Sequence, residues 1–369
     1  MMRHAAIDIL LRALGPAPDW TALSETDWDV LLRLGRASDL LARVAQRAFD
    51  QGYEASPRVE VHLRSSRLLA ARQHRELALE LQVIDRIFAE ARIPLVVLKG
   101  SAYALSGLQA AAGRMVSDID LMVPTASLPQ AESALMMAGW VSANRDAYDQ
   151  RYYRTWMHEI PPMRHIHRGT VIDLHHNILP PTGRIKLDAS ALLQCARPLE
   201  GFRGLQVLAP HDMVLHSAAH LTHEGELDTG LRGLVDLDAL VRELACNPTF
   251  MPDLHDRAIA LGLGLPLFQA LRVTNHVLGT PLPAGWLERL AEASGFDPDA
   301  VGQRVLARCW SSAVLPRHSL VQDRWAPVAR SLLYLRGHWL RMPPDLLLRH
   351  LARKAVRAVW PTGDRHGAA

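Results

Sequence analysis

The chain has 369 residues, enough for two or three structural units, and its 49% hydrophobic content is too high for an intrinsically disordered protein. Its 41 basic residues nearly balance 38 acidic ones. The resulting net charge of +3 does not by itself indicate a nucleic-acid-binding protein, although it does not exclude nucleic acid as a partner.

Cysteine usage and the N-terminus indicate a cytoplasmic protein. Cys195, Cys246 and Cys309 lie far apart and are odd in number, so they predict neither a disulfide framework nor a CxxC metal site. The first apolar run is interrupted by Asp8 and Arg12, which favours an amphipathic helix over a signal peptide. No stretch reaches about 18 uninterrupted apolar residues, so no membrane span is expected.

Residues 1–92 have a helical pattern. Ser24 is expected to cap a helix over about 25–49, with an acid three positions further on, and a second amphipathic helix is expected over about 57–92. This region is predicted to be a helical N-terminal unit.

Residues 93–208 combine strand-like and helix-like segments. Short strands are expected at PLVVLKG, SDIDLMVP and WVSA, followed by MRHIHRG and TVIDLHHNI, which meet at Arg168–Gly169. A helix is expected at SLPQAESALMMAG, whereas YDQRYYRTW is aromatic-rich and shows no clear pattern. These segments predict a compact α+β core with a small mixed sheet.

Residues 209–369 return to the helical period, most clearly in APHDMVLHSAAHLTH and TGLRGLVDLDALVREL. The predicted fold class is therefore α+β, with helical regions before and after the mixed-sheet core.

Three carboxylates are predicted to converge at one end of the sheet. Side chains alternate along a strand, so Asp118 and Asp120 face the same way. Asp173 lies in a second strand-like run, and if the two strands are neighbours, all three acids meet. Such a group suits Mg²⁺ or Mn²⁺, which bind carboxylates together with substrate phosphates. It is also the arrangement required for two-metal nucleotidyl transfer.

The segment Lys99–Gly100–Ser101 leaves one strand and enters a helix. Gly100 permits close approach of a ligand to the backbone, the N–H groups at the helix start attract phosphate, and Ser101 can donate a hydrogen bond. Lys99 and Arg114 can neutralise triphosphate charge. These four residues are predicted to bind the nucleotide.

The ordered set K-G-S-A, R-M-V-S-D-I-D-L-M-V and V-I-D-L-H resembles the nucleotidyltransferase superfamily, and within it a poorly characterised bacterial branch that carries Lys-Gly. This resemblance covers about 93–241. It implies that Asp118, Asp120 and Asp173 are the catalytic and metal-binding acids. It also implies that an NTP, with ATP as the first candidate, donates an NMP to an acceptor hydroxyl on a small molecule, protein or RNA. Lys99 departs from the more common small residue, so the phosphate contacts need not follow the common pattern.

Other polar residues are candidates for accessory roles. His175 should share the face of Asp173, while Arg232 and Asp236 either form a salt-bridged helix face or reach the nucleotide or acceptor. A helix face also carries His216, His220 and His223, for which packing or nucleotide contact is favoured over a zinc site.

Two functions remain open from the sequence. The first is an active metal-dependent nucleotidyltransferase, favoured because all three acids are present. The alternative is a non-catalytic nucleotide-binding or protein-interaction module that retains the fold.

Overall fold

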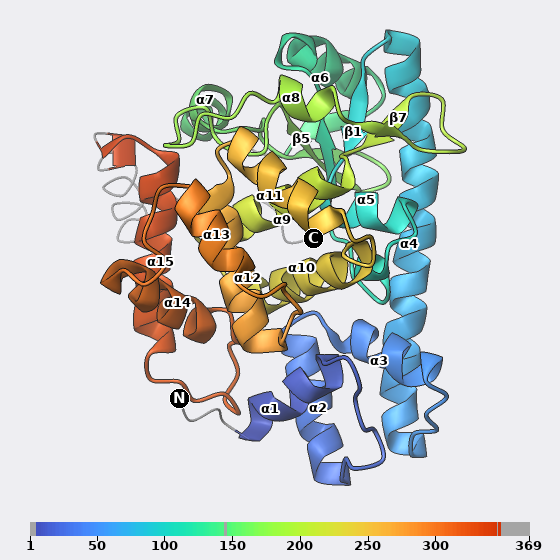
Figure 1. Cartoon of the computed structure of the whole chain (residues 1–369). Coiled ribbons are helices and arrows are strands. Elements are labelled where there is room, and N and C mark those ends of the chain that lie inside the picture. The colour runs from blue at the N-terminus through green and yellow to red at the C-terminus, as the bar shows by residue number, and fades with distance from the viewer. Residues whose placement is uncertain (1–4, 144–145, 345, 348–369) are drawn as a thin grey trace.

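The computed structural model describes residues 5–143, 146–344 and 346–347. Within these ranges it contains fifteen α-helices and one seven-stranded mixed sheet, which confirms the predicted α+β class. Figure 1 shows the sheet at one end of the molecule, with the first helices at the opposite end.

The sheet has the strand order β3-β4-β5-β2-β1-β7-β6. Its central strands β2 and β5 run parallel, and their register places Asp120 opposite Asp173. The flanking strand β1 is antiparallel to β2 and parallel to β7. The strands are β1 (Leu95–Val97), β2 (Ile119–Met122), β3 (Trp140–Ser142), β4 (Met163–His165), β5 (Val171–His175), β6 (Arg197–Pro198) and β7 (Leu205–Val207).

The N-terminal region contains α1 (Ala5–Leu14), α2 (Glu25–Ala37), α3 (Leu41–Asp50) and α4 (Pro57–Ala91). Ser24 caps α2, and its side chain and that of Asp27 form the expected reciprocal capping box. The single helix expected over 25–49 was wrong, because the chain turns between α2 and α3 where Asp39 adopts φ 58°. The long helix α4 runs along one side of the molecule and connects the N-terminal helices with the sheet end (Figure 1).

Short helices are inserted between the strands: α5 (Lys99–Leu105), α6 (Leu128–Met137), α7 (Ala147–Trp156) and α8 (Ser190–Leu193). Helix α7 covers the aromatic-rich stretch for which the sequence showed no pattern. Asp146 caps this helix by accepting hydrogen bonds from the backbone N–H groups of Tyr148 and Asp149. Aromatic rings four residues apart also lie together, as in Tyr152 and Trp156, whose centroids are 6.0 Å apart.

The C-terminal region is helical as far as it is described. Its helices are α9 (Pro210–His223), α10 (Gly230–Leu244), α11 (Phe250–Ala260), α12 (Gly264–Leu278), α13 (Trp286–Ala293), α14 (Val301–Ala313) and α15 (Ala326–Arg341). No described helix is long and apolar enough to cross a membrane.

One hydrophobic core extends through the described chain, from Ile7 in α1 to Leu333 in α15. The expected boundaries at 92/93 and 208/209 fall between α4 and β1 and between β7 and α9. The division of the chain into three domains at these boundaries stays a prediction. Helix α9 packs against α5, and α10 packs against the turn at Gln109–Ala111, so both contact the segment between β1 and β2.

Candidate functional site

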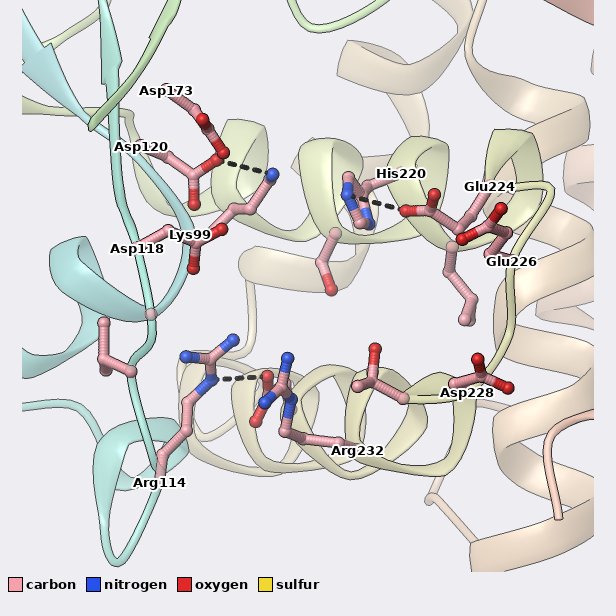
Figure 2. Close-up of a pocket in the computed structure, with 18 of the residues that line it drawn as sticks. Lys99, Arg114, Asp118, Asp120, Asp173, His220, Glu224, Glu226, Asp228 and Arg232 are labelled. Atoms are coloured by element: carbon pink, nitrogen blue, oxygen red, sulfur yellow. Dashed lines mark hydrogen bonds and ion pairs between the residues drawn. The ribbon is translucent and has the colours of Figure 1, made fainter. Parts of the chain in front are cut away.

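Three carboxylates meet where β2 and β5 lie side by side. Asp118 immediately precedes β2, Asp120 lies within it, and Asp173 is the register partner of Asp120 on β5. One carboxylate oxygen from each lies within 4.8 Å of the other two. Figure 2 shows these side chains pointing toward the same space. The structure thus brings together all three acids predicted from the sequence.

Asp120 is buried and held by two donors. Lys99 Nζ lies 2.6 Å and His175 Nε2 lies 3.0 Å from Asp120 Oδ1. Burial opposes ionisation of Asp120, but the Lys99 charge and the His175 hydrogen bond outweigh it and hold the pKa of the carboxyl below its ordinary value. Because both contacts use Oδ1, Oδ2 is the oxygen that can face a cation.

Lys99 occupies an unusual backbone position. It is the first residue of α5 and adopts φ 48°, in the left-handed region that non-glycine residues rarely enter. Burial opposes its charge, yet Asp120 raises the pKa of the Lys99 ammonium above its ordinary value. This lysine is therefore a permanent cation beside the three acids.

Asp173 has the opposite electrostatic character. Burial, followed by the negative charges of Asp120 and Glu159, raises the pKa of its carboxyl above the ordinary value. Its Oδ1 atom is buried and has no hydrogen-bond partner. A buried oxygen without a donor, next to two further carboxylates, is an environment that a divalent cation would stabilise.

A pocket of about 440 Å³ opens in front of the acids. In Figure 2 it lies between the strand ends, α9 with His220 and Glu224, and α10 with Arg232. Its lining is predominantly polar and includes Lys99, Gly100, Arg114, Asp118, Asp120, Glu159, Asp173, Ser217, His220, Glu224, Glu226, Asp228, Thr229, Arg232 and Asp236. The pocket combines an acidic end that suits metal with cationic groups that suit phosphate.

Arg114 is fixed at the pocket wall by an ion pair to α10. Its Nε atom lies 2.7 Å from Oδ2 of Asp236, and Arg43 Nη2 lies 3.0 Å from Oδ1 of the same carboxylate. Asp236 is only 4% exposed. It therefore positions Arg114 instead of reaching freely into the pocket.

Gly100 makes the position of Arg114 possible. A Cβ atom on Gly100 would lie 1.8 Å from Arg114 Nη1, far inside van der Waals contact. In the structure, the group that approaches Gly100 is a guanidinium from the same chain, and the predicted approach of a ligand stays a prediction.

A Gly100→Ala substitution is expected to displace the Arg114 guanidinium and to weaken NTP binding by about 10-fold, the loss of one charge-assisted contact. Calorimetric titration of ATP with Mg²⁺ measures the effect. Gly302→Ala is the matched control, because no heavy atom lies within 4 Å of a Cβ placed there. Equal affinities for the two variants would contradict the role assigned to Gly100.

Two other predicted residues lie differently from Lys99 and Arg114. The hydroxyl of Ser101 is buried without a hydrogen-bond partner, and Ser101 is not among the residues that line the pocket. Arg232 does line the pocket, and its Nη1 atom is 3.2 Å from Asp39 Oδ2. Of the predicted nucleotide-binding group, the pocket itself is lined by Lys99, Gly100 and Arg114.

Sequence reasoning missed Glu159. This residue lines the pocket, and its Oε2 atom lies 3.4 Å from His175 Nδ1. It follows the aromatic helix α7 and makes a single β-bridge to His175, so no strand alternation or motif spacing marked it. Only the fold places it beside the acids.

The α9 histidines do not form a metal group among the described residues. His220 lines the pocket and its Nε2 atom is 3.0 Å from Glu224 Oε2, whereas His216 is only 2% exposed. Burial, followed by the Lys99 charge, lowers the pKa of His216 to about 3.

The buried His216 is expected to make stability pH-dependent. The unfolded histidine binds a proton near its ordinary pKa of about 6.5, but the folded one does not until far lower pH, so acid favours unfolding. Relative to His216→Gln, the wild-type free energy of unfolding should fall by about 1.4 kcal/mol per pH unit between about pH 6 and 4. Urea unfolding across this range measures the difference, and parallel pH profiles would contradict the assignment.

The chain matches a known protein family. A family model described as "Uncharacterised nucleotidyltransferase" matches residues 24–279. The matched range starts at the cap of α2 and ends just after α12, so it contains every residue of the pocket. No curated protein and no solved structure is significantly similar to the chain.

Proposed function

The chain belongs to this uncharacterised nucleotidyltransferase family, and we propose that it transfers an NMP from an NTP, with ATP as the first candidate, to an acceptor hydroxyl. The observation that carries the proposal is the convergence of Asp118, Asp120 and Asp173 at a pocket that also presents Lys99 and Arg114. Family membership implies a nucleotide substrate, and the acidic group supplies a place for metal.

The acids fit the metal that this reaction requires. Asp120 Oδ2, Asp173 Oδ1 and a carboxylate oxygen of Asp118 would hold Mg²⁺ or Mn²⁺. When bound, the metal ions neutralise the triphosphate and lower the pKa of the acceptor hydroxyl. The unpartnered Oδ1 of Asp173 supports this fit, because a purely structural carboxylate would normally have a donor.

The cationic side chains would orient the triphosphate. Arg114, fixed by Asp236, would contact its oxygens from the α10 side, and Lys99 would balance charge beside Asp120. Gly100 leaves room for both the guanidinium and the phosphates. We assign Ser101 a supporting position behind this wall, since its hydroxyl is buried.

In the reaction, the acceptor oxygen would bond to the α-phosphorus while the bond to the leaving pyrophosphate oxygen breaks. Asp173, beside the other two acids at the pocket, is placed to receive the hydroxyl proton. His175 would keep Asp120 oriented through the Nε2–Oδ1 hydrogen bond. Arg232 would contact the nucleotide or acceptor from α10.

The test is transfer of label from α-³²P-labelled NTPs, with Mg²⁺, to pools of small hydroxyl compounds, proteins and RNA. Label on one pool together with stoichiometric pyrophosphate is the expected result, and Asp118→Asn should abolish both. Triphosphate binding without label transfer to any pool would favour the non-catalytic nucleotide-binding alternative.

A further inference from the structure

A second group of ligand-type side chains lies beyond His175, on the side away from Asp120. His158 and Glu159 are held against the end of β5 by the backbone. Ile160 N–H donates to the carbonyl of Leu174 at 3.0 Å, and His176 N–H donates to the carbonyl of His158 at 2.8 Å. The segment is therefore fixed in place by the same strand that carries Asp173.

The hydrogen-bonding pattern of His175 leaves one nitrogen without a suitable partner. Its Nε2 atom faces Asp120 Oδ1 at 3.0 Å, and an ionised carboxylate only accepts, so Nε2 carries the hydrogen. On the other side of the ring, Nδ1 lies 3.4 Å from Glu159 Oε2 and makes no hydrogen bond. A cation bound between this nitrogen and the Glu159 carboxylate would give both atoms a partner.

His158 also has an unpartnered ring nitrogen. Its Nδ1 atom is buried and has no hydrogen-bond partner, as is true of His175 Nδ1. The two rings have centroids 5.3 Å apart. One ligand-type atom from each of His158, Glu159 and His175 lies within 4.8 Å of the others.

The geometry and chemistry suit a tetrahedral transition-metal ion. Metal–ligand distances of about 2.0–2.1 Å place neighbouring tetrahedral ligands about 3.3 Å apart. The distance of 3.4 Å between Glu159 Oε2 and His175 Nδ1 is close to this value. Imidazole nitrogens favour Zn²⁺-type ions, whereas the all-carboxylate group next to them favours Mg²⁺.

A small cavity adjoins this group. It has a volume of about 80 Å³ and is lined by His158, Glu159, Lys99, His220 and Glu224, among others. A water molecule occupies about 30 Å³, so the cavity has room for a metal-bound water as fourth ligand. The Lys99 charge is already balanced by Asp120 Oδ1 at 2.6 Å, which limits its repulsion of an ion.

We propose that His158, Glu159 and His175 bind one divalent transition-metal ion of the Zn²⁺ type, separate from the ions of the three aspartates. Asp120 then accepts the hydrogen bond from Nε2 of the metal-bound His175 and orients its ring. The ion fixes the His175 ring and, through it, the orientation of Asp120. Binding at this place does not depend on the transfer reaction.

The experiment measures Zn²⁺ content by elemental analysis after dialysis, together with Zn²⁺ affinity by competition with a chelating dye. We expect one tightly held Zn²⁺ per wild-type chain. Affinity should fall by about 100-fold in His158→Ala and in Glu159→Gln. The Zn²⁺ affinity should be unchanged in the double variant Asp118→Asn/Asp173→Asn. It should also be unchanged in His62→Ala, the control, because His62 is exposed and lies far from the three ligands in the sequence.

Co²⁺ provides an independent readout, because a tetrahedral site with nitrogen ligands produces strong visible absorption bands. These bands should be absent from folded His158→Ala and Glu159→Gln, with folding checked by circular dichroism. Folded wild type that binds no Zn²⁺ would overturn the proposal and leave a protonated His175 between Asp120 and Glu159. Binding lost only in the aspartate double variant would overturn it too, by placing the ion at the three aspartates.

Discussion

Asp173→Asn should strongly weaken metal-dependent triphosphate binding while making the metal-free protein more stable. The carboxyl of Asp173 is largely buried beside Asp120 and Asp118, and burial and like charges raise its pKa. An asparagine removes one of three mutually repelling charges, and its amide can donate to the remaining carboxylates. We expect a gain on the order of 1 kcal/mol without metal at pH 8 and a loss of NTP affinity of about 100-fold with Mg²⁺.

Thermal unfolding in EDTA, and again with Mg²⁺ and ATP, separates the two effects. Wild type should be stabilised by metal and nucleotide, and Asp173→Asn should not, because only ligands that bind the folded state raise its stability. Asp29→Asn serves as the control, since Asp29 forms an exposed pair with Arg33. If Asp173→Asn were destabilised in EDTA and still stabilised by Mg²⁺ and ATP, the site as described would be wrong.

Asp236→Ala is expected to cost about 3–5 kcal/mol of folding stability. Asp236 lies between Arg43 and Arg114, and its substitution leaves two mostly buried guanidinium groups without their carboxylate. The side chains of Asp236 and Arg43 are each only 5% exposed, so water cannot replace the lost contact. Nucleotide affinity should fall as well, because Arg114 loses the group that positions it.

Urea unfolding monitored by circular dichroism measures this loss. Asp228→Ala is a suitable control: Asp228 lies at the same pocket, but its ion pair with Arg317 is 61% exposed on both sides. The control should change stability by less than about 1 kcal/mol. Similar small losses in both variants would show that the buried ion pairs of Asp236 do not hold α10 against the sheet end.

The acidic site could be predicted from the sequence because its signals are local. Asp118 immediately precedes β2 and Asp120 lies within it, and the alternation of side chains along an extended segment predicts that both face the same way. Asp173 stands among apolar residues that form the neighbouring parallel strand, and the observed register places it opposite Asp120. The α+β class was predicted from the spacing of apolar residues, which changes between helical and alternating along the chain.

The rest of the site depends on contacts between distant segments. Asp236 is 122 residues from Arg114 and 193 from Arg43, and no periodicity relates these positions. Glu159 and His158 follow α7, whose many aromatic residues obscure the helical spacing of its apolar positions. The segment contacts β5 through a single bridge. The short strands β6 and β7 were also not predicted individually, since two or three residues are too few to show alternation.

Metal-dependent nucleotide binding at the three aspartates is the property on which the proposed function depends. Calorimetric titration of the four NTPs into the protein, with Mg²⁺ and with EDTA, tests it for wild type and for Asp118→Asn/Asp173→Asn. We expect that at least one NTP binds wild type only with Mg²⁺ and does not bind the double variant. Folded wild type that binds no NTP with Mg²⁺, or a double variant that binds as wild type does, would contradict it.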